Sequence, residues 1–197
     1  RFAAHTDAIM LDSRLFARID ALYRQRDAIS DPEARRLVER YHEDYVRAGA
    51  RLSDADKERL KTLNAELATL SSQFNQFVLD EVNASAVVVD DVKMLDGLTP
   101  AQIAAAATEA ESRGLPGKYV LTLLNTTGQP PNAQLTNRAL RQRLHEASVA
   151  RGSRGGDFDT RGIISRVIRL RAERAKLLGY DTPAAFAIAD QTARTPE

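Results

Sequence analysis

The stretch LKTLNAELATLSSQFNQF, Leu60 to Phe77, is the most regular pattern in the sequence and decides the fold class. Its large apolar residues recur at alternating spacings of three and four, which places them along one side of an α-helix. Ser53, with Asp56 three residues later, predicts where this helix begins. Because a long helix with one apolar side needs other elements to cover it, the stretch predicts a mainly helical fold. The residues of this apolar seam are Leu60, Leu63, Leu67, Leu70, Phe74 and Phe77.

Two different partners are compatible with this seam. A second copy of the chain would make it a coiled coil and the protein a helical dimerisation or interaction module. Other helices of the same chain would instead make it part of an internal core. The flanking positions hold Asn64, Ser71 and Gln73 rather than alternating charges, which favours packing within the chain and leaves the interaction module as the alternative.

Further helix signals lie on both sides of this stretch. One predicted helix spans about residues 12–29, and a second spans 31–49 with Asp31 as N-cap, Pro32 at the first helical position and Gly49 at its end. Its predicted buried face consists of Leu37, Val38, Tyr41 and Tyr45. Later helices are predicted over about 99–114, 136–150 and 160–178, and another begins at Thr182 and Pro183.

Two short β-branched runs interrupt the helices. ASAVVVDD (84–91) and KYVLTLLNTTGQPP (118–131) are bounded by polar residues, glycine and proline, as strands are. They predict a two-strand β insertion at about 86–125, and the helix between them leaves the pairing direction open. The predicted fold class is therefore mainly α, a multi-helix region with a small two-strand β insertion.

Composition excludes several classes of function. The chain has no cysteine, so it has no disulfide, thiolate metal site or cysteine nucleophile. It has no apolar run of the roughly 18 residues that a membrane span needs, so no membrane partner is predicted. Residues 138–176 carry ten Arg and one Lys against four acids, but Phe158 is the only aromatic ring among them. We therefore expect the arginines to form the outside of packed helices, and we predict no nucleic-acid partner.

Two histidines are each followed by a glutamate, as in the zinc peptidase motif H-E-x-x-H, but the second histidine of the motif is missing. In H-E-x-x-H, two histidines four residues apart hold the metal and the glutamate activates water. The His-Glu pairs at 42–43 and 145–146 are followed at the fifth position by Val46 and Val149, which cannot bind zinc. His5 has no second ligand at a suitable spacing. The sequence thus predicts no catalytic residue and no metal ligand in this chain, and it does not identify the substrate-binding residues.

Three segments carry a resemblance to a known family. RAGARLS (47–53), NTTGQPP (125–131) and RAERAKLLGY (171–180) stand in an order and at spacings that are similar to those of bacterial peptidyl-dipeptidases. These enzymes belong to the thimet oligopeptidase and oligopeptidase A family of zinc metallopeptidases. The resemblance covers essentially the whole chain.

The resemblance implies a role for the chain and a place for the missing chemistry. It implies that residues 1–197 are the helical N-terminal region of a longer peptidase, one wall of a channel that holds oligopeptide substrates. The H-E-x-x-H helix of the family lies in a C-terminal catalytic domain that is absent from this chain. Zinc would then be a cofactor of the full-length protein and not of this part.

Other expectations concern the whole protein. We expect it to hydrolyse oligopeptides, releasing C-terminal dipeptides, with this chain contacting the missing catalytic domain. We expect it in the cytoplasm, with the periplasm as the alternative, and its oligomeric state is open. Thr195, Pro196 and Glu197 form an N-cap, proline and acid pattern that predicts the start of a further helix.

Overall fold

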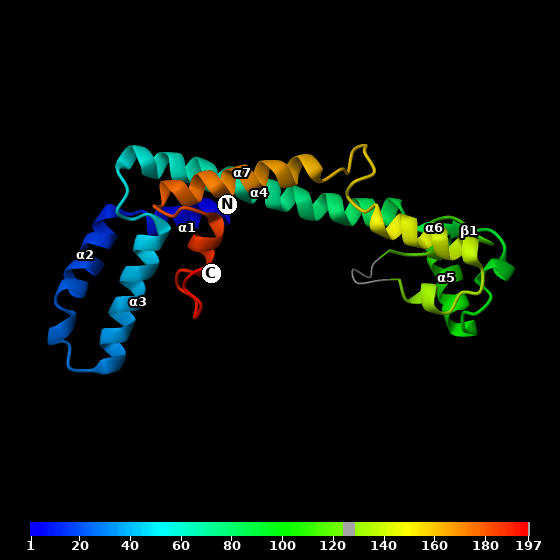
Figure 1. Ribbon diagram of the computed structural model, residues 1–197, viewed down its shortest axis with the longest axis horizontal. Coiled ribbons are helices and arrows are strands. Elements are labelled where there is room, and N and C mark those ends of the chain that lie inside the picture. Colours follow the sequence, from blue (N-terminus) through cyan, green and yellow to red (C-terminus); the bar gives the residue numbers. More distant parts are fainter. Residues whose placement is uncertain (124–128, 197) are drawn as a thin grey trace. The chain divides into compact units, whose positions relative to one another are not determined.

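The computed structural model describes residues 1–123 and 129–196. Over these residues it contains eight α-helices and one two-stranded antiparallel sheet (Figure 1), so the predicted fold class is confirmed. The chain divides into two compact units. The first contains residues 1–72 and 163 onward, and the second contains residues 73–162.

Three helices open the first unit: α1 (Phe2–Met10), α2 (Ser13–Arg24) and α3 (Pro32–Ala48). The sequence did not predict α1, because its N-cap residue Arg1 makes no capping hydrogen bond from its side chain. A tertiary contact stabilises this helix instead, since Asp7 Oδ1 accepts a hydrogen bond from Asn64 Nδ2 at 2.9 Å.

An antiparallel hairpin is formed by α2 and α3, joined through the 3-10 turn η1 (Arg26–Ala28) (Figure 1). Asp12 caps α2 by accepting hydrogen bonds from two backbone N–H groups, and Asp31 caps α3 by accepting one from the backbone N–H of Glu33. Gly49 ends α3 in the left-handed conformation, as predicted. The predicted span 12–29 therefore contains two elements, a helix and a 3-10 turn, rather than one helix.

The predicted buried face of α3 is wrong for half of its residues. Leu37 and Tyr41 are 57% and 52% exposed, whereas His42 and Tyr45 are buried. The aromatic rings of α2 explain this difference, because Phe16 stacks on Tyr45 at 6.4 Å. The face of α3 that packs on α2 thus follows ring stacking rather than the most apolar side of the helix.

The long helix α4 (Asp54–Ala84) begins where the sequence predicts, because Ser53 Oγ accepts a hydrogen bond from the backbone N–H of Asp56 at 3.1 Å. Within the first unit it packs against α7 (Arg161–Leu177) (Figure 1). Two ion pairs join the helices, Glu66 with Arg166 and Arg59 with Glu173. Because these pairs run in opposite order along the two helices, α4 and α7 are antiparallel.

The first part of the predicted seam is covered within the chain. Leu60 is 1% exposed, and Leu63 and Leu67 form a core with Leu170 of α7. This confirms the interpretation that favoured internal packing for these three positions. Gly179 follows α7 with a positive φ of 83°, and α8 (Pro183–Ile188) begins after its N-cap Thr182, both as predicted.

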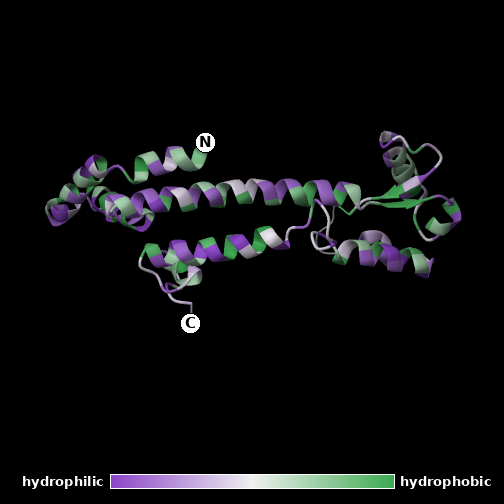
Figure 2. Cartoon of the chain, turned by 90° about the horizontal axis from the view of Figure 1, so that it is seen from above, coloured by the Kyte–Doolittle hydropathy of each residue, from purple (hydrophilic) through white to green (hydrophobic). Residues whose placement is uncertain are grey.

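The second unit is built on the sheet. β1 (Val87–Val89) pairs with β2 (Tyr119–Leu121), with Val88 opposite Val120, so the open question of direction is settled as antiparallel. Both strands are strongly hydrophobic (Figure 2). Between them lie the 3-10 turn η2 (Val92–Leu95) and α5 (Pro100–Ser112), whose Thr99 and Gln102 form a complete capping box. Residues 124 and 125 of the predicted insertion lie outside the described residues.

The remaining elements of the second unit are the 3-10 turn η3 (Pro130–Ala133) and α6 (Arg138–Val149). Asn137 caps α6, close to the predicted start at residue 136. The core of this unit joins both strands, α5, α6 and the end of α4. Its buried residues are Val82, Val87, Val89, Leu95, Leu98, Ala106, Leu121, Leu123, Leu135, Leu140 and Leu144.

Within residues 1–123 and 129–196, no helix is long and apolar enough to cross a membrane. Thr195 and Pro196 are not helical, and Glu197 lies outside the described residues. The helix predicted to start there stays a prediction, as does the assignment of residues 1–197 to the N-terminal region of a longer protein.

Candidate functional site

The three histidines lie in different surroundings. His5 and His145 are exposed, and His42 is buried at 7% exposure. Glu146, beside His145, accepts a hydrogen bond from Gln142 one turn earlier on the surface of α6. Over the described ranges, the structure contains no group of three or more His, Cys, Asp or Glu residues that can hold a metal ion.

His42 belongs to the packing of the α2–α3 hairpin. Its ring stacks on Tyr23, and its Nε2 lies 3.2 Å from Asp20 Oδ1 and 3.3 Å from Arg51 Nη2. Burial alone would raise the pKa of Asp20, but the hydrogen bond with His42 and the charge of Arg24 together hold it below its usual value. This arrangement brings a histidine and a carboxylate together with no adjacent nucleophile, so it indicates structural stabilisation rather than catalysis.

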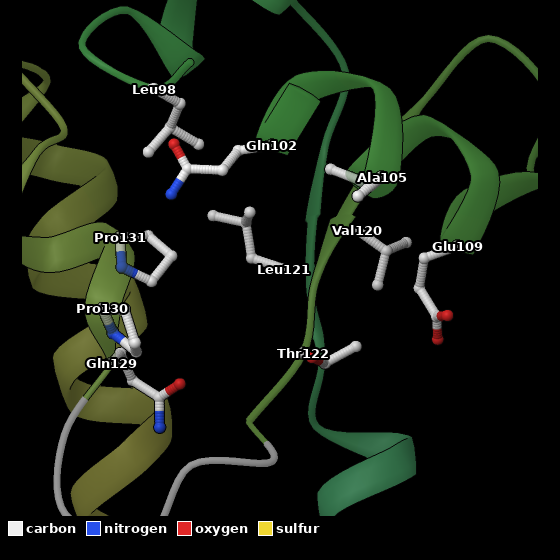
Figure 3. A pocket seen from close by; sticks show the side chains of 11 residues that line it. Leu98, Gln102, Ala105, Glu109, Val120, Leu121, Thr122, Gln129, Pro130 and Pro131 are labelled. Carbon is white, nitrogen blue, oxygen red and sulfur yellow. The ribbon is translucent and has the colours of Figure 1, made fainter. Parts of the chain in front are cut away.

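A cavity of the second unit lies beside β2 and is called the β2 groove below. Its volume is about 430 Å³, and its walls come from α5, β2 and η3 (Figure 3). Leu121 of β2 and Pro131 of η3 stand on opposite sides of it (Figure 3). The lining residues are Leu98, Gln102, Ala105, Ala106, Glu109, Val120, Leu121, Thr122, Gln129, Pro130 and Pro131.

The polar side chains of the β2 groove are largely engaged in internal contacts. Gln129 is buried and donates a hydrogen bond from Nε2 to Ser148 Oγ at 3.1 Å. Glu109 accepts a hydrogen bond from Arg113 Nε at 2.7 Å. The groove therefore offers mainly apolar surface, and no nucleophile with an adjacent base lies among its lining residues.

A strand edge adds a second feature to the β2 groove. β2 pairs with β1 along one edge, and no other described strand pairs with it. A strand with a free edge can hold an extended peptide through backbone hydrogen bonds, with adjacent apolar surface accommodating alternate side chains. The groove and the edge together suit the binding of an extended peptide segment, which sequence reasoning did not find because strand and η3 meet only in the fold.

A cavity of similar volume in the first unit is lined by two arginines and two glutamates among its other residues. Its lining includes Tyr23 and His42 on the hairpin and Arg47 near the end of α3. Asp190 lies between Arg40 and Arg47, at 3.2 and 3.0 Å. A hydrogen bond from Gln191, opposed by burial and assisted by the Arg47 charge, lowers the pKa of Asp190. These charges pair with one another, so they do not indicate a ligand.

Within the described residues, three of the ten arginines of segment 138–176 form ion pairs with acids of the same chain. Arg166 makes a two-pronged contact with Glu66 at 2.6 and 2.8 Å, and Arg161 hydrogen-bonds Asp159, which strongly lowers the pKa of that carboxyl group. Arg154 Nε lies 2.5 Å from Glu81, which is 5% exposed. For Arg166, which is exposed on α7, this agrees with the expectation that the arginines lie on the outside of packed helices, whereas Arg154 lies in the loop before α7.

Comparison with known proteins confirms the resemblance predicted from the sequence. Residues 132–197 match Peptidase family M3. Over 190 residues, the chain is 46% identical to a dipeptidyl carboxypeptidase of Escherichia coli, a match that covers 96% of the chain. It is 45% identical over 196 residues to a dipeptidyl carboxypeptidase of Salmonella typhimurium, covering 99% of the chain.

A more distant relative has a different name. The organellar oligopeptidase A of Arabidopsis thaliana is 34% identical over 176 residues, a match that covers 86% of this chain and 22% of that protein. The matches to the two dipeptidyl carboxypeptidases cover 28% and 29% of their length. The chain thus spans less than a third of the curated relatives that it matches.

Proposed function

We propose that this chain is the N-terminal, substrate-holding part of a family M3 zinc metallopeptidase that releases dipeptides from the C-termini of oligopeptides. Its near end-to-end similarity to two proteins named dipeptidyl carboxypeptidase is the observation that carries this proposal. The lower identity to the organellar oligopeptidase A favours an activity like that of the dipeptidyl carboxypeptidases.

The chain and the remainder of the protein have separate roles in this proposal. The described residues do not form a zinc site, because no suitable group of ligands comes together. We therefore assign zinc and the catalytic residues to the remainder of the protein, and we derive no catalytic step from this chain. Its own contribution is to bind and orient the peptide, which raises the effective concentration of substrate at the reacting centre.

The β2 groove is the part of the chain to which we assign this binding. It combines apolar walls with an edge of β2 that no other described strand pairs with, and these two features can hold an extended peptide without reading its full sequence. As one wall of a peptide channel, it would act on substrate position rather than on bond cleavage. A defect in the groove should consequently weaken substrate binding more than turnover.

Two alanines on α5 provide a matched test in the full-length protein. Ala105 lines the β2 groove, whereas its neighbour Ala104 does not, and both are exposed. Ala105→Arg should fill the groove and raise KM for an N-blocked tripeptide by roughly tenfold with little change in kcat. Ala104→Arg introduces the same side chain on the same helix and should leave both constants unchanged.

Two outcomes would contradict the proposal at different points. Equal kinetics for the two variants would remove the β2 groove from substrate binding but leave the peptidase assignment intact. A full-length protein that contains no zinc, or that fails to release dipeptides, would contradict the peptidase assignment itself.

A further inference from the structure

A pocket of the first unit brings together two arginines that form no ion pair within the described residues. This arginine pocket, of about 400 Å³, lies between α1, α4 and α7. Its polar lining residues are Thr6, Asp7, Asn64, Ser71, Arg171 and Arg174. None of these residues is part of the β2 groove, so the inference does not depend on the proposed function.

Arg174 is the residue whose donors are least satisfied. A guanidinium group has five N–H donors. Within the described residues, Arg174 donates one hydrogen bond, from Nη1 to Asn64 Oδ1 at 3.5 Å. Its Nε is buried and has no hydrogen-bond partner there. The ring of Phe186 lies 5.4 Å from the guanidinium carbon and supplies only a cation–π contact. The described residues therefore leave donors of Arg174 without an acceptor.

Arg171 adds a second positive charge to the same pocket. It lies three residues before Arg174 on α7, which places both side chains on one side of the helix. It is exposed and forms no ion pair within the described part of the chain. Burial and the repulsion from Arg171 both lower the pKa of Arg174. Two like charges held together in this way favour the binding of an anion.

Asp7 limits the charge of that anion. It is the one carboxylate among the lining residues, and it hydrogen-bonds Asn64 rather than either arginine. Burial raises the pKa of Asp7, while the charges of Lys61 and Arg174 act in the opposite direction. With Asp7 ionised, the two arginines leave one positive charge to be neutralised.

We propose that the arginine pocket binds a carboxylate group between the guanidinium groups of Arg171 and Arg174. A carboxylate is planar, which fits the planar fork of N–H donors of a guanidinium group. It also carries a single negative charge, which fits the charge balance of the pocket. A phosphate dianion would bring two negative charges close to Asp7. The pocket volume of about 400 Å³ exceeds the size of acetate, which leaves room for a larger carboxylate such as an amino acid or a short peptide.

The test follows the arginine Nε–H signals of the ¹⁵N-labelled chain by nuclear magnetic resonance. Sodium acetate, glycylglycine, glycylglycinamide and inorganic phosphate are titrated separately at constant ionic strength, because exposed charges respond to salt alone. The expected result is a saturable shift of the Arg171 and Arg174 signals with acetate and glycylglycine, and none with glycylglycinamide. Tighter binding of glycylglycine than of acetate would identify a peptide as the source of the carboxylate.

Variants on α7 distinguish carboxylate binding in the arginine pocket from a general attraction of anions to a basic helix. Arg171→Gln removes an exposed member of the pocket and should weaken carboxylate binding by roughly tenfold. Arg169→Gln makes the same change of charge at an exposed position outside the pocket and should change the affinity by less than about twofold. Arg174→Gln should abolish binding, with circular dichroism to check that the helices are retained.

Several results would overturn the proposal. Acetate and glycylglycine shifts that do not saturate would show that the pocket is not a binding site. Equal binding of glycylglycinamide, or tighter binding of phosphate than of acetate, would exclude a carboxylate as the ligand. An equal loss of affinity in Arg169→Gln and Arg171→Gln would assign the effect to net charge.

Discussion

The imidazole ring of His42 on α3 lies flat against the Tyr23 ring on α2, with the ring centroids 3.7 Å apart and 6° between the planes. Nε2 of His42 also faces both Asp20 and Arg51. It can donate a proton to the first or accept one from the second, but it cannot do both at once. Either way, the ring joins two helices near the middle of the hairpin.

His42→Ala should therefore destabilise the first unit. The substitution removes a buried aromatic ring and its stacking, which should lower the free energy of unfolding by about 2–4 kcal/mol. Urea denaturation followed by circular dichroism measures the change. His145→Ala, at an exposed position of α6, is the control and should change the stability by less than about 0.5 kcal/mol. Equal stability of both variants would contradict a packing role for His42.

Leu67 provides a test between internal packing and dimerisation. It is 7% exposed and packs with Leu63 and Leu170, so Leu67→Ala should lower the free energy of unfolding by about 2–4 kcal/mol. Leu79→Ala, on the same helix at 52% exposure, should have little effect. Both changes are measured by urea denaturation.

The alternative function as a dimerisation module predicts a different result for Leu67. If this residue lay at an interface between two copies, its loss would dissociate a dimer, and the apparent stability would depend on protein concentration. Sedimentation of Leu67→Ala and of the unaltered chain distinguishes the two. We expect the same sedimentation behaviour for both, because the side chain is already covered by α7.

Helix ends could be predicted from the sequence because their signals are local. Asp31 and Pro32 mark the start of α3, and the capping box of Thr99 and Gln102 marks the start of α5. In each case the residues that satisfy the free backbone N–H groups lie within one turn of them. Such signals do not depend on the rest of the fold.

Contacts between distant residues could not be predicted in the same way. The buried Glu81 pairs with Arg154, which is 73 positions away along the chain, and no local pattern joins the two. The arginine pocket has the same origin, since its walls come from α1, α4 and α7, which are far apart in sequence. The walls of the β2 groove lie within residues 98–131, but a helix, a strand and a 3-10 turn must pack together to form it. The incomplete H-E-x-x-H spacings at 42–46 and 145–149 could be recognised from the local sequence, whereas the location of the two binding surfaces required the fold.

Gly49 is a position where both space and backbone conformation require glycine. Its φ is 103°, and an added Cβ would lie 2.7 Å from Leu60 Cδ2. Gly49→Ala should therefore lower the free energy of unfolding by about 2–4 kcal/mol, from backbone strain together with the displaced leucine. Gly114→Ala is a matched control, because its φ is also positive but no atom lies within 4 Å. Gly114→Ala should lower the free energy of unfolding by about 1 kcal/mol, from backbone strain alone. Equal losses of stability for Gly49→Ala and Gly114→Ala in thermal or urea unfolding would contradict the steric explanation.

The ion pair between Glu66 and Arg166 should make stability depend on acid pH. Hydrogen bonds from Arg166 lower the pKa of Glu66 in the folded chain, although burial acts against this shift. Since the folded value lies below the unfolded one, the stabilisation is fully present above the ordinary glutamate value of 4.5 and is lost as the pH falls through the folded value. Glu66→Gln should accordingly be less stable than the unaltered chain at neutral pH, and the difference should shrink below about pH 4.

Urea denaturation at several pH values measures this difference, with the exposed Glu111→Gln as control. A difference for Glu66→Gln that stays constant from neutral to acid pH would show that the pair does not contribute through its charge.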